Sequence, residues 1–240
     1  MFARNINKSL HSVRDDGQIL CALRRDKFSI DFLLYLEIKF YRAMDSIFFN
    51  IFVNLPSLKT ERLLLRKLVY EDTDDIYEYA KIPQTSEYVL WYPHGSKYES
   101  LEYLNLVYEK YNHGEPSPWG IVLNETGKLI GSIGYVKIDE KELTGEIGYV
   151  ISPHFWNKGF ATEAVKKAVE FGFDEMKLNK IVAHTITQNR ASGRVLLRAG
   201  FTFDGTKHGY MEIKNKPVDI DFYSISETEF KKSRDNLKKS

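Results

Sequence analysis

One stretch limits the possible folds most strongly: SPHFWNKGFATEAVKKAVEFGF, residues 152–173. From Ala161 to Gly172, small and apolar residues recur at helical spacing, and charged residues take the other side. A helix whose apolar face carries mostly alanine, valine and glycine can lie close on a β-sheet. The stretch therefore predicts an amphipathic helix that packs on a sheet through its small residues.

The start of this helix indicates an anion site. No Ser, Thr, Asp or Asn stands directly before Gly159, so the first backbone N–H groups lack an obvious side-chain acceptor. Gly159 permits backbone conformations closed to other residues, Ala161 adds little bulk, and Lys158 adds a positive charge. These features suit a phosphate or pyrophosphate at the helix N-terminus. The alternative is that Asn157 caps the helix and Gly159 only fits a tight turn.

Strand and helix patterns alternate from Pro56 onward. A three-stranded antiparallel meander is predicted over residues 119–152, with turns at Asn124–Gly127 and Asp139–Gly145. This order is typical of an α/β or α+β domain with an open sheet. The other predicted elements are a strand at 61–69, helices at 71–82 and 97–114, a strand at 180–187, a helix at 190–200, and a final hairpin of 201–213 with 219–226.

The two ends of the chain differ from this domain. Residues 1–55 form an aromatic-rich N-terminal extension that we expect to be helical or poorly ordered, and to lie on the main domain, a second subunit or a membrane surface. Alternatively, translation starts naturally at Met44. The apolar run at residues 46–58 is shorter than the roughly 20 residues that a membrane span needs. We expect residues 231–240 to form a basic C-terminal tail that is the solvated end of a helix.

Composition narrows the function classes. A net charge of +1 over 240 residues gives little support to nucleic-acid or membrane attraction. Cys21 cannot form an internal disulfide, and no signal peptide is recognisable, so we expect a cytoplasmic protein. The scattered histidines predict no metal site, and His184, within an apolar strand, is expected to be a core histidine. Neither a P-loop nor a dinucleotide-binding glycine motif is present.

The order of the motifs carries a resemblance. The segments GEIGYVISPHFWNKGFATEAV and NRASGRVLLRAGFTFDG, preceded by LKTERLLLR and followed by DIDFYSI, resemble the GNAT superfamily of N-acetyltransferases, in its RimJ/RimL-like branch, over residues 57–228. The resemblance implies a GNAT domain at 56–230. Its central sheet would be mostly antiparallel, with about six to seven strands flanked by helices. This sheet would be splayed between its fourth and fifth strands.

The resemblance also implies where acetyl-CoA binds. The family's pyrophosphate loop, Q/R-x-x-G-x-G/A, matches residues 156–161, with Trp156 in place of Gln or Arg. Main-chain groups after the splay would bind the pantetheine arm, flanked by an N-x-x-S motif whose serine is Ser192. Leu196 occupies the place where many relatives carry a tyrosine acid, so Ser192 or a water is the expected proton donor. The implied cofactor-binding residues are Tyr149, Val150, Ile151, Trp156, Asn157, Lys158, Gly159, Phe160, Ala161, Thr162, Asn189 and Ser192.

Acetyl transfer to an amine also needs a base, because the attacking nitrogen must be neutral. Strand alternation places Glu146 on one face with Gly148, which leaves room for a substrate beside a carboxylate. We expect Glu146 to act as the base through water; the alternative is a solvated strand carboxylate. The family's acceptor-binding loop would fall at Trp91, Tyr92 and His94, which could line the acceptor pocket. The alternative is that they are buried structural residues, a role at least as common for aromatic side chains.

The resemblance, together with these residues, implies an acetyl-CoA-dependent N-acetyltransferase that transfers directly to a primary amine without a metal. Cys21 lies far from the motifs, which argues against a cysteine-bound intermediate. The alternative is a non-catalytic acyl-CoA-binding module whose extension mediates interactions. The acceptor stays open among a protein N-terminus, an antibiotic, a polyamine and another small amine, because fold does not select substrate. We expect a monomer or homodimer.

Overall fold

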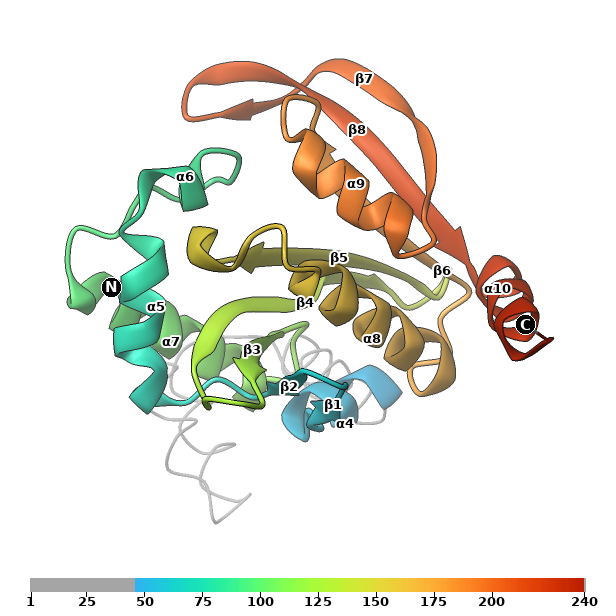
Figure 1. Cartoon of the computed structure of the whole chain (residues 1–240), viewed down its shortest axis with the longest axis horizontal. Coiled ribbons are helices and arrows are strands. Elements are labelled where there is room, and N and C mark those ends of the chain that lie inside the picture. Colours follow the sequence, from blue (N-terminus) through green and yellow to red (C-terminus); the bar gives the residue numbers. More distant parts are fainter. Residues whose placement is uncertain (1–45, 240) are drawn as a thin grey trace, which may run out of the picture. The chain divides into compact units, whose positions relative to one another are not determined.

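The computed structural model describes residues 46–239 and contains one open sheet (Figure 1). Eight strands are hydrogen-bonded within the described residues, in the order β1-β2-β3-β4-β5-β6-β8-β7. All neighbours are antiparallel except β5 and β6, which run parallel. The strands are β1 (Leu58–Lys59), β2 (Leu63–Arg66), β3 (Pro118–Leu123), β4 (Leu129–Asp139), β5 (Thr144–Ile151), β6 (Lys180–Ile186), β7 (Thr202–Ile213) and β8 (Lys216–Ser226).

The helices lie between these strands and at the ends of the described chain. The predicted helix at 97–114 ends at Asn112, and Gly114 follows it with a φ of 62°, the left-handed conformation expected of a glycine stop. The helices are α4 (Ile47–Val53), α5 (Thr73–Ala80), α6 (Pro83–Ser86), α7 (Lys97–Asn112), α8 (Phe160–Asp174), α9 (Arg190–Arg198) and α10 (Glu227–Lys239), with 3₁₀ turns η1 (Tyr70–Asp72) and η2 (Pro153–Phe155).

Helix α8 packs closely on the sheet, as its small residues predict. The Tyr135 hydroxyl of β4 donates a hydrogen bond to the Ala168 carbonyl at 3.1 Å. At Gly172, a Cβ would collide with the same Tyr135 hydroxyl, so glycine is needed there for the close approach. Figure 1 shows α8 and α9 next to each other, and they are in contact.

The two faces of the sheet are covered by different helices. Tyr135 faces α8, and its partner on β5 is Ile147. Ser132 points to the opposite face, toward Tyr79 of α5. Its register partner Val150 shares that face. Residues of β5 therefore alternate between the α8 face and the α5 face.

Helix α4 belongs to the same core as the sheet. It falls within the segment that the sequence sets apart as an extension, but Phe48 and Phe52 are buried in the main apolar cluster. The Trp119 indole nitrogen donates to the Pro56 carbonyl at 2.7 Å, and the Lys67 ammonium donates to the Val53 carbonyl at 2.6 Å. The rest of the extension, residues 1–45, and the proposed start at Met44 lie outside the described residues.

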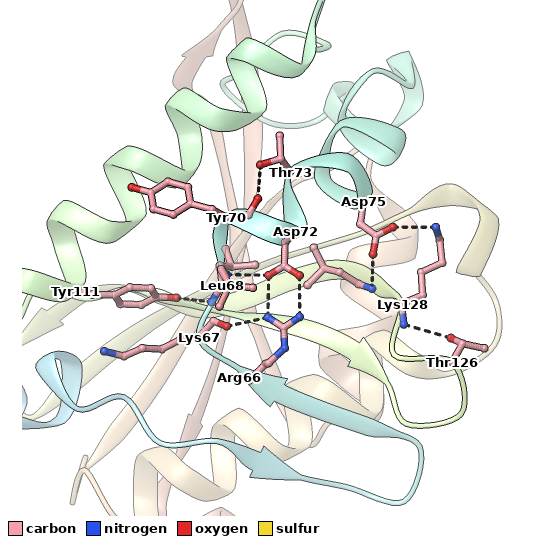
Figure 2. Close-up of polar contacts among 12 residues, drawn as sticks. Arg66, Lys67, Leu68, Tyr70, Asp72, Thr73, Asp75, Tyr111, Thr126 and Lys128 are labelled. Atoms are coloured by element: carbon pink, nitrogen blue, oxygen red, sulfur yellow. Dashed lines mark hydrogen bonds and ion pairs between the residues drawn. The ribbon is translucent and has the colours of Figure 1, made fainter.

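Figure 2 shows how the turn before α5 is fastened to the sheet. Asp72 accepts two hydrogen bonds from the guanidinium of Arg66, each at 2.7 Å, and one from the Val69 backbone N–H at 2.9 Å. One helical turn later, Asp75 accepts from the Leu129 backbone N–H at 2.9 Å and from the Lys128 ammonium at 3.0 Å. The run of acids thus fixes α5 to β2 and β4.

The predicted fold class is confirmed: the domain is mixed α/β with one open, mostly antiparallel sheet flanked by helices. The short strand β1 adds an edge to the six or seven strands that we expected. For this reason the parallel pair at the predicted splay is β5 and β6 instead of the fourth and fifth strands. The C-terminal segment continues from β8 as helix α10.

Candidate active site between α8 and α9

No side chain among the described residues caps the N-terminus of α8. Gly159 occupies the N-cap position with φ 82° and ψ −3°, a left-handed conformation that favours glycine. Asn157 also has a positive φ, 59°, and does not cap the helix, so that alternative is wrong. The first backbone N–H groups of α8 consequently point out of the helix without an intrahelical acceptor.

Arg62, which lies about 100 residues earlier in the sequence, holds this loop in place through direct contacts. Its guanidinium donates to the Lys158 carbonyl at 3.0 Å and to the Glu163 carboxylate at 2.7 Å, and it lies 4.6 Å from the centre of the Phe160 ring. Thr60 donates a further hydrogen bond to Glu163 at 2.6 Å. Burial alone would raise the pKa of Glu163, but the hydrogen bonds from Thr60 and Arg62 outweigh it and lower that pKa.

Trp156 fixes the loop to the end of β5. Its indole N–H donates to the Ile151 carbonyl at 2.7 Å, while about half of the residue stays exposed. We expected the main-chain groups of Ile151 to bind the pantetheine arm, but its carbonyl oxygen accepts this bond from Trp156. The ammonium of Lys158 lies 5.1 Å from the centre of the Phe155 ring.

The splay begins at Glu146. The β5–β6 ladder pairs Thr144 with Lys180 and ends where Glu146 meets Val182. From Ile147 to Ile151, β5 remains paired with β4, but no described strand pairs with it on its β6 side. Main-chain groups on that side of β5 therefore face an opening in the sheet.

A hydrogen bond joins β5 to α9 beside this opening. The hydroxyls of Tyr149 and Ser192 lie 2.8 Å apart, and the Tyr149 hydroxyl also donates to the Ser192 carbonyl at 3.1 Å. Asn189 holds Ser192 in place, because its side chain accepts from the Ser192 backbone N–H at 3.1 Å and caps α9. Burial raises the pKa of Tyr149 well above its ordinary value, so the phenol keeps its proton at neutral pH.

A cavity of about 360 Å³ connects these features. It is bordered by the Gly159 turn, the end of β5, one face of α9 and the segment around α6. The predicted cofactor-binding residues line it with one exception, Lys158: the lining includes Tyr149, Val150, Ile151, Trp156, Asn157, Gly159, Phe160, Ala161, Thr162, Asn189 and Ser192. An uncapped helix start, a left-handed glycine and unpaired strand edges fit a ligand that carries phosphates and amides, as acetyl-CoA does.

Glu146 lies at the opening but does not line this cavity. Its carboxylate is 3.0 Å from Nδ1 of His184, and the two side chains are 29% and 33% exposed. The pair bridges β5 and β6 directly after their ladder ends. His184 also contacts the Phe222 ring, with ring centroids 4.6 Å apart. The expectation of a core histidine is wrong, because this face of β6 is left partly open where β5 departs.

The predicted acceptor-loop residues do not line the cavity. Tyr92 is 63% exposed and lies under the Lys214 ammonium, while His94 bonds to the Ser100 hydroxyl at 2.8 Å. The Trp91 and His94 rings are in contact, with centroids 5.5 Å apart. From the preceding segment, the residues that line the cavity are Gln84, Thr85, Glu87, Tyr88 and Val89.

Sequence reasoning missed two groups of lining residues. Residues 84–89 carry no motif or periodicity that indicates a site. On α9, by contrast, helical spacing from Ala191 leads to Arg194, Val195 and Arg198, all of which line the cavity. This second group was accessible from the sequence, because the N-x-x-S motif already fixed one face of the helix.

Two further features of the described residues bear on chemistry. Between residues 46 and 239, no group of three or more His, Cys, Asp and Glu side chains is arranged to hold a metal ion. In the same part of the chain, no helix combines the length and apolar character needed to cross a membrane.

Comparisons with known proteins give a consistent result. The family model for an acetyltransferase (GNAT) domain matches residues 62–202. The N-acetyltransferase YoaA of Bacillus subtilis is 34% identical over 170 residues, which cover 71% of this chain and 96% of that protein. The N-acetyltransferase p20 of Bacillus licheniformis is 30% identical over 176 residues, 73% of this chain and 99% of that protein.

A solved structure agrees with these sequence matches. The crystal structure of a GNAT-family acetyltransferase from Bacillus anthracis superposes with a TM-score of 0.65 at 29% identity. It covers 72% of this chain and 99% of that chain. The similarity therefore extends over nearly the whole length of each of these relatives.

Proposed function

This chain belongs to the GNAT family of N-acetyltransferases, and from that premise we propose that Glu146 deprotonates a primary amine that attacks acetyl-CoA directly. Bound acetyl-CoA supplies the activated acetyl group as a thioester. The family also favours catalysis over the alternative of a non-catalytic acyl-CoA-binding module.

One observation carries the proposal: the cavity and Glu146 meet at the same opening from different faces of the sheet. Tyr149 points to the α8 face, where Ser192 and the Gly159 turn border the cavity. Glu146 follows the alternation of Gly148 and Val150 on the α5 face. An acetyl donor on the α8 face and an amine on the α5 face could therefore meet where β5 and β6 separate.

Glu146 is suited to accept the proton from the amine. A partly exposed carboxylate can take up a proton through a bound water, and an amine that is mostly protonated at neutral pH needs such an acceptor. His184 holds the carboxylate at the opening through the 3.0 Å contact. His184 thus acts as a positioning residue in this proposal.

Other residues would stabilise charge and return a proton. Backbone N–H groups of β5 on the side that lacks β6 can donate to an oxygen that gains negative charge. The hydroxyl of Ser192 can donate its proton to the leaving sulfur and recover one from water, while the Tyr149 hydroxyl 2.8 Å away holds it in position. This pair would replace the tyrosine acid whose place Leu196 takes; Leu196 is fully buried.

The acceptor is a primary amine whose class we leave open among the four kinds that the sequence allows. Trp91, Tyr92 and His94 remain proposed contacts of its outer part, and residues 84–89 offer lining nearer to the opening. The cytoplasmic location and the monomeric or homodimeric state stay predictions.

The experiment is a pH profile of kcat/KM for Glu146→Gln, with Glu142→Gln as the matched control. Glu142 is an exposed carboxylate in the turn before β5. We expect Glu146→Gln to lower kcat/KM about 10²- to 10⁴-fold at neutral pH, with partial recovery at high pH where the amine loses its proton unaided. Acetyl-CoA affinity should not change. A full rate for Glu146→Gln across the pH range would exclude Glu146 as the base.

A further inference from the structure

Helix α9 carries three arginines and no acidic residue. Arg190, Arg194 and Arg198 follow one another at intervals of four residues, and the helix has no Asp or Glu. Like charges at this spacing repel each other. Within residues 46–239, no hydrogen bond or ion pair joins any of these guanidinium groups to a carboxylate.

The other arginines of the described chain are all paired. Arg62 is bound to Glu163, Arg66 to Asp72, and Arg234 to Asp174. The arginines of α9 are therefore exceptions in a domain that otherwise neutralises its guanidinium groups. An unpaired pair of neighbouring guanidinium groups is suited to an external dianion, because each presents a planar fork of donors.

Two of the three arginines lie at the cavity. Arg194 and Arg198 line it together with the Gly159 turn, whereas Arg190 does not. Glu87, the carboxylate among the lining residues, comes from the segment after α6 and forms no ion pair with either arginine. The cavity thus has two cationic borders: the N-terminus of α8 and this part of α9.

Coenzyme A has a matching distribution of charge. Its pyrophosphate suits the Gly159 turn, and its ribose carries a separate 3′-phosphate that bears up to two further charges. We propose that Arg194 and Arg198 bind the 3′-phosphate and make the enzyme selective for coenzyme A over 3′-dephospho-coenzyme A. This inference rests on the acetyl-CoA site of the proposed function. It adds that this site distinguishes ligands with and without the 3′-phosphate.

The test is isothermal titration with two ligands, coenzyme A and 3′-dephospho-coenzyme A, so that no turnover is required. Wild-type protein should bind coenzyme A about ten- to a hundredfold more tightly, as expected for charge-assisted hydrogen bonds to a phosphate. In the double variant Arg194→Gln/Arg198→Gln, the affinity for coenzyme A should fall to that for the dephospho ligand, which should change little.

Arg190→Gln is the matched control, since it removes an arginine from the same helix but not from the cavity. It should keep the wild-type ratio of affinities, and thermal unfolding of each variant checks that α9 still folds. Equal weakening of both ligands in the double variant, or an unchanged ratio, would overturn the assignment to the 3′-phosphate while leaving the seat in place. Failure of wild-type protein to bind either ligand would overturn the seat as well.

Discussion

At the scale of single residues, the loop before α8 depends on side chains from distant parts of the sequence. Gly159 supplies the left-handed turn, and Arg62 and Glu163 hold the loop on both sides of it. A Cβ at Gly159 would lie 3.3 Å from the Arg62 guanidinium, so the Arg62 side chain packs closely against the backbone at Gly159. The shape of the proposed anion site is therefore set by this ion pair as well as by the glycine.

The ion pair predicts a pH-dependent contribution to stability. The pKa of Glu163 is lowered from its ordinary value of 4.5, so its contribution is full above that pH and is lost as the pH falls through the lower folded value. Glu163→Gln should reduce the free energy of unfolding at pH 7 by about 1 kcal/mol, because Arg62 is partly exposed. Denaturant unfolding at several pH values measures this.

The comparison with Glu170→Gln isolates the effect. Glu170 also forms an ion pair, with Lys167 three residues earlier, but is 47% exposed, so its removal should matter less. The difference between Glu163→Gln and wild type should shrink below pH 4.5. A difference that stays constant down to low pH would mean that the carboxylate charge is not responsible.

At the scale of elements, the site depends on where strands stop pairing and which helices cover each face. The separation of β5 from β6 after Glu146 leaves main-chain groups of β5 unpaired where we propose that both substrates meet, while the contacts of α5 fix the opposite face. The link between α5 and the sheet passes through the bidentate pair of Arg66 and Asp72, and Asp72 is 5% exposed.

Breaking that link should destabilise the whole domain. Asp72→Asn removes the charge that pairs with Arg66 and weakens the bond to Val69, so we expect a loss of about 2 to 4 kcal/mol in unfolding free energy. Asp74→Asn is the control, because the Asp74–Lys97 pair is exposed on both sides and should contribute less than about 1 kcal/mol. Equal effects of the two substitutions in denaturant unfolding would contradict the role of Asp72.

The elements themselves were largely predictable from the sequence. The three-stranded meander, the small-faced helix α8 and the final hairpin each follow from local periodicity and turn residues. The ion pair of Arg62 with Glu163 was not predictable, because the two residues are 101 positions apart and no sequence pattern connects them. The contact of Tyr149 with Ser192 depends in the same way on how α9 docks against β5.

At the scale of the whole molecule, the described chain is one compact unit from Ile47 that includes more than the motifs cover. Phe48 and Phe52 complete a core that the sequence boundary at residue 55 would have divided. The position of His184 was mistaken for a similar reason: burial depends on which strands separate, and the splay leaves this histidine beside Glu146. Local sequence pattern therefore predicts the motifs, whereas the burial and neighbours of each residue depend on tertiary packing.

The central claim is that acetyl-CoA is seated at the uncapped start of α8, and titration of acetyl-CoA into Gly159→Val tests it most directly. Gly127→Val is the control, because Gly127 has a φ of 70° in the β3–β4 turn, with nothing within 4 Å of an added Cβ, and so bears similar backbone strain away from the cavity. We predict wild-type affinity for Gly127→Val and at least about tenfold weaker binding for Gly159→Val, a loss of about 1.4 kcal/mol. Wild-type affinity in a folded Gly159→Val protein would contradict the claim.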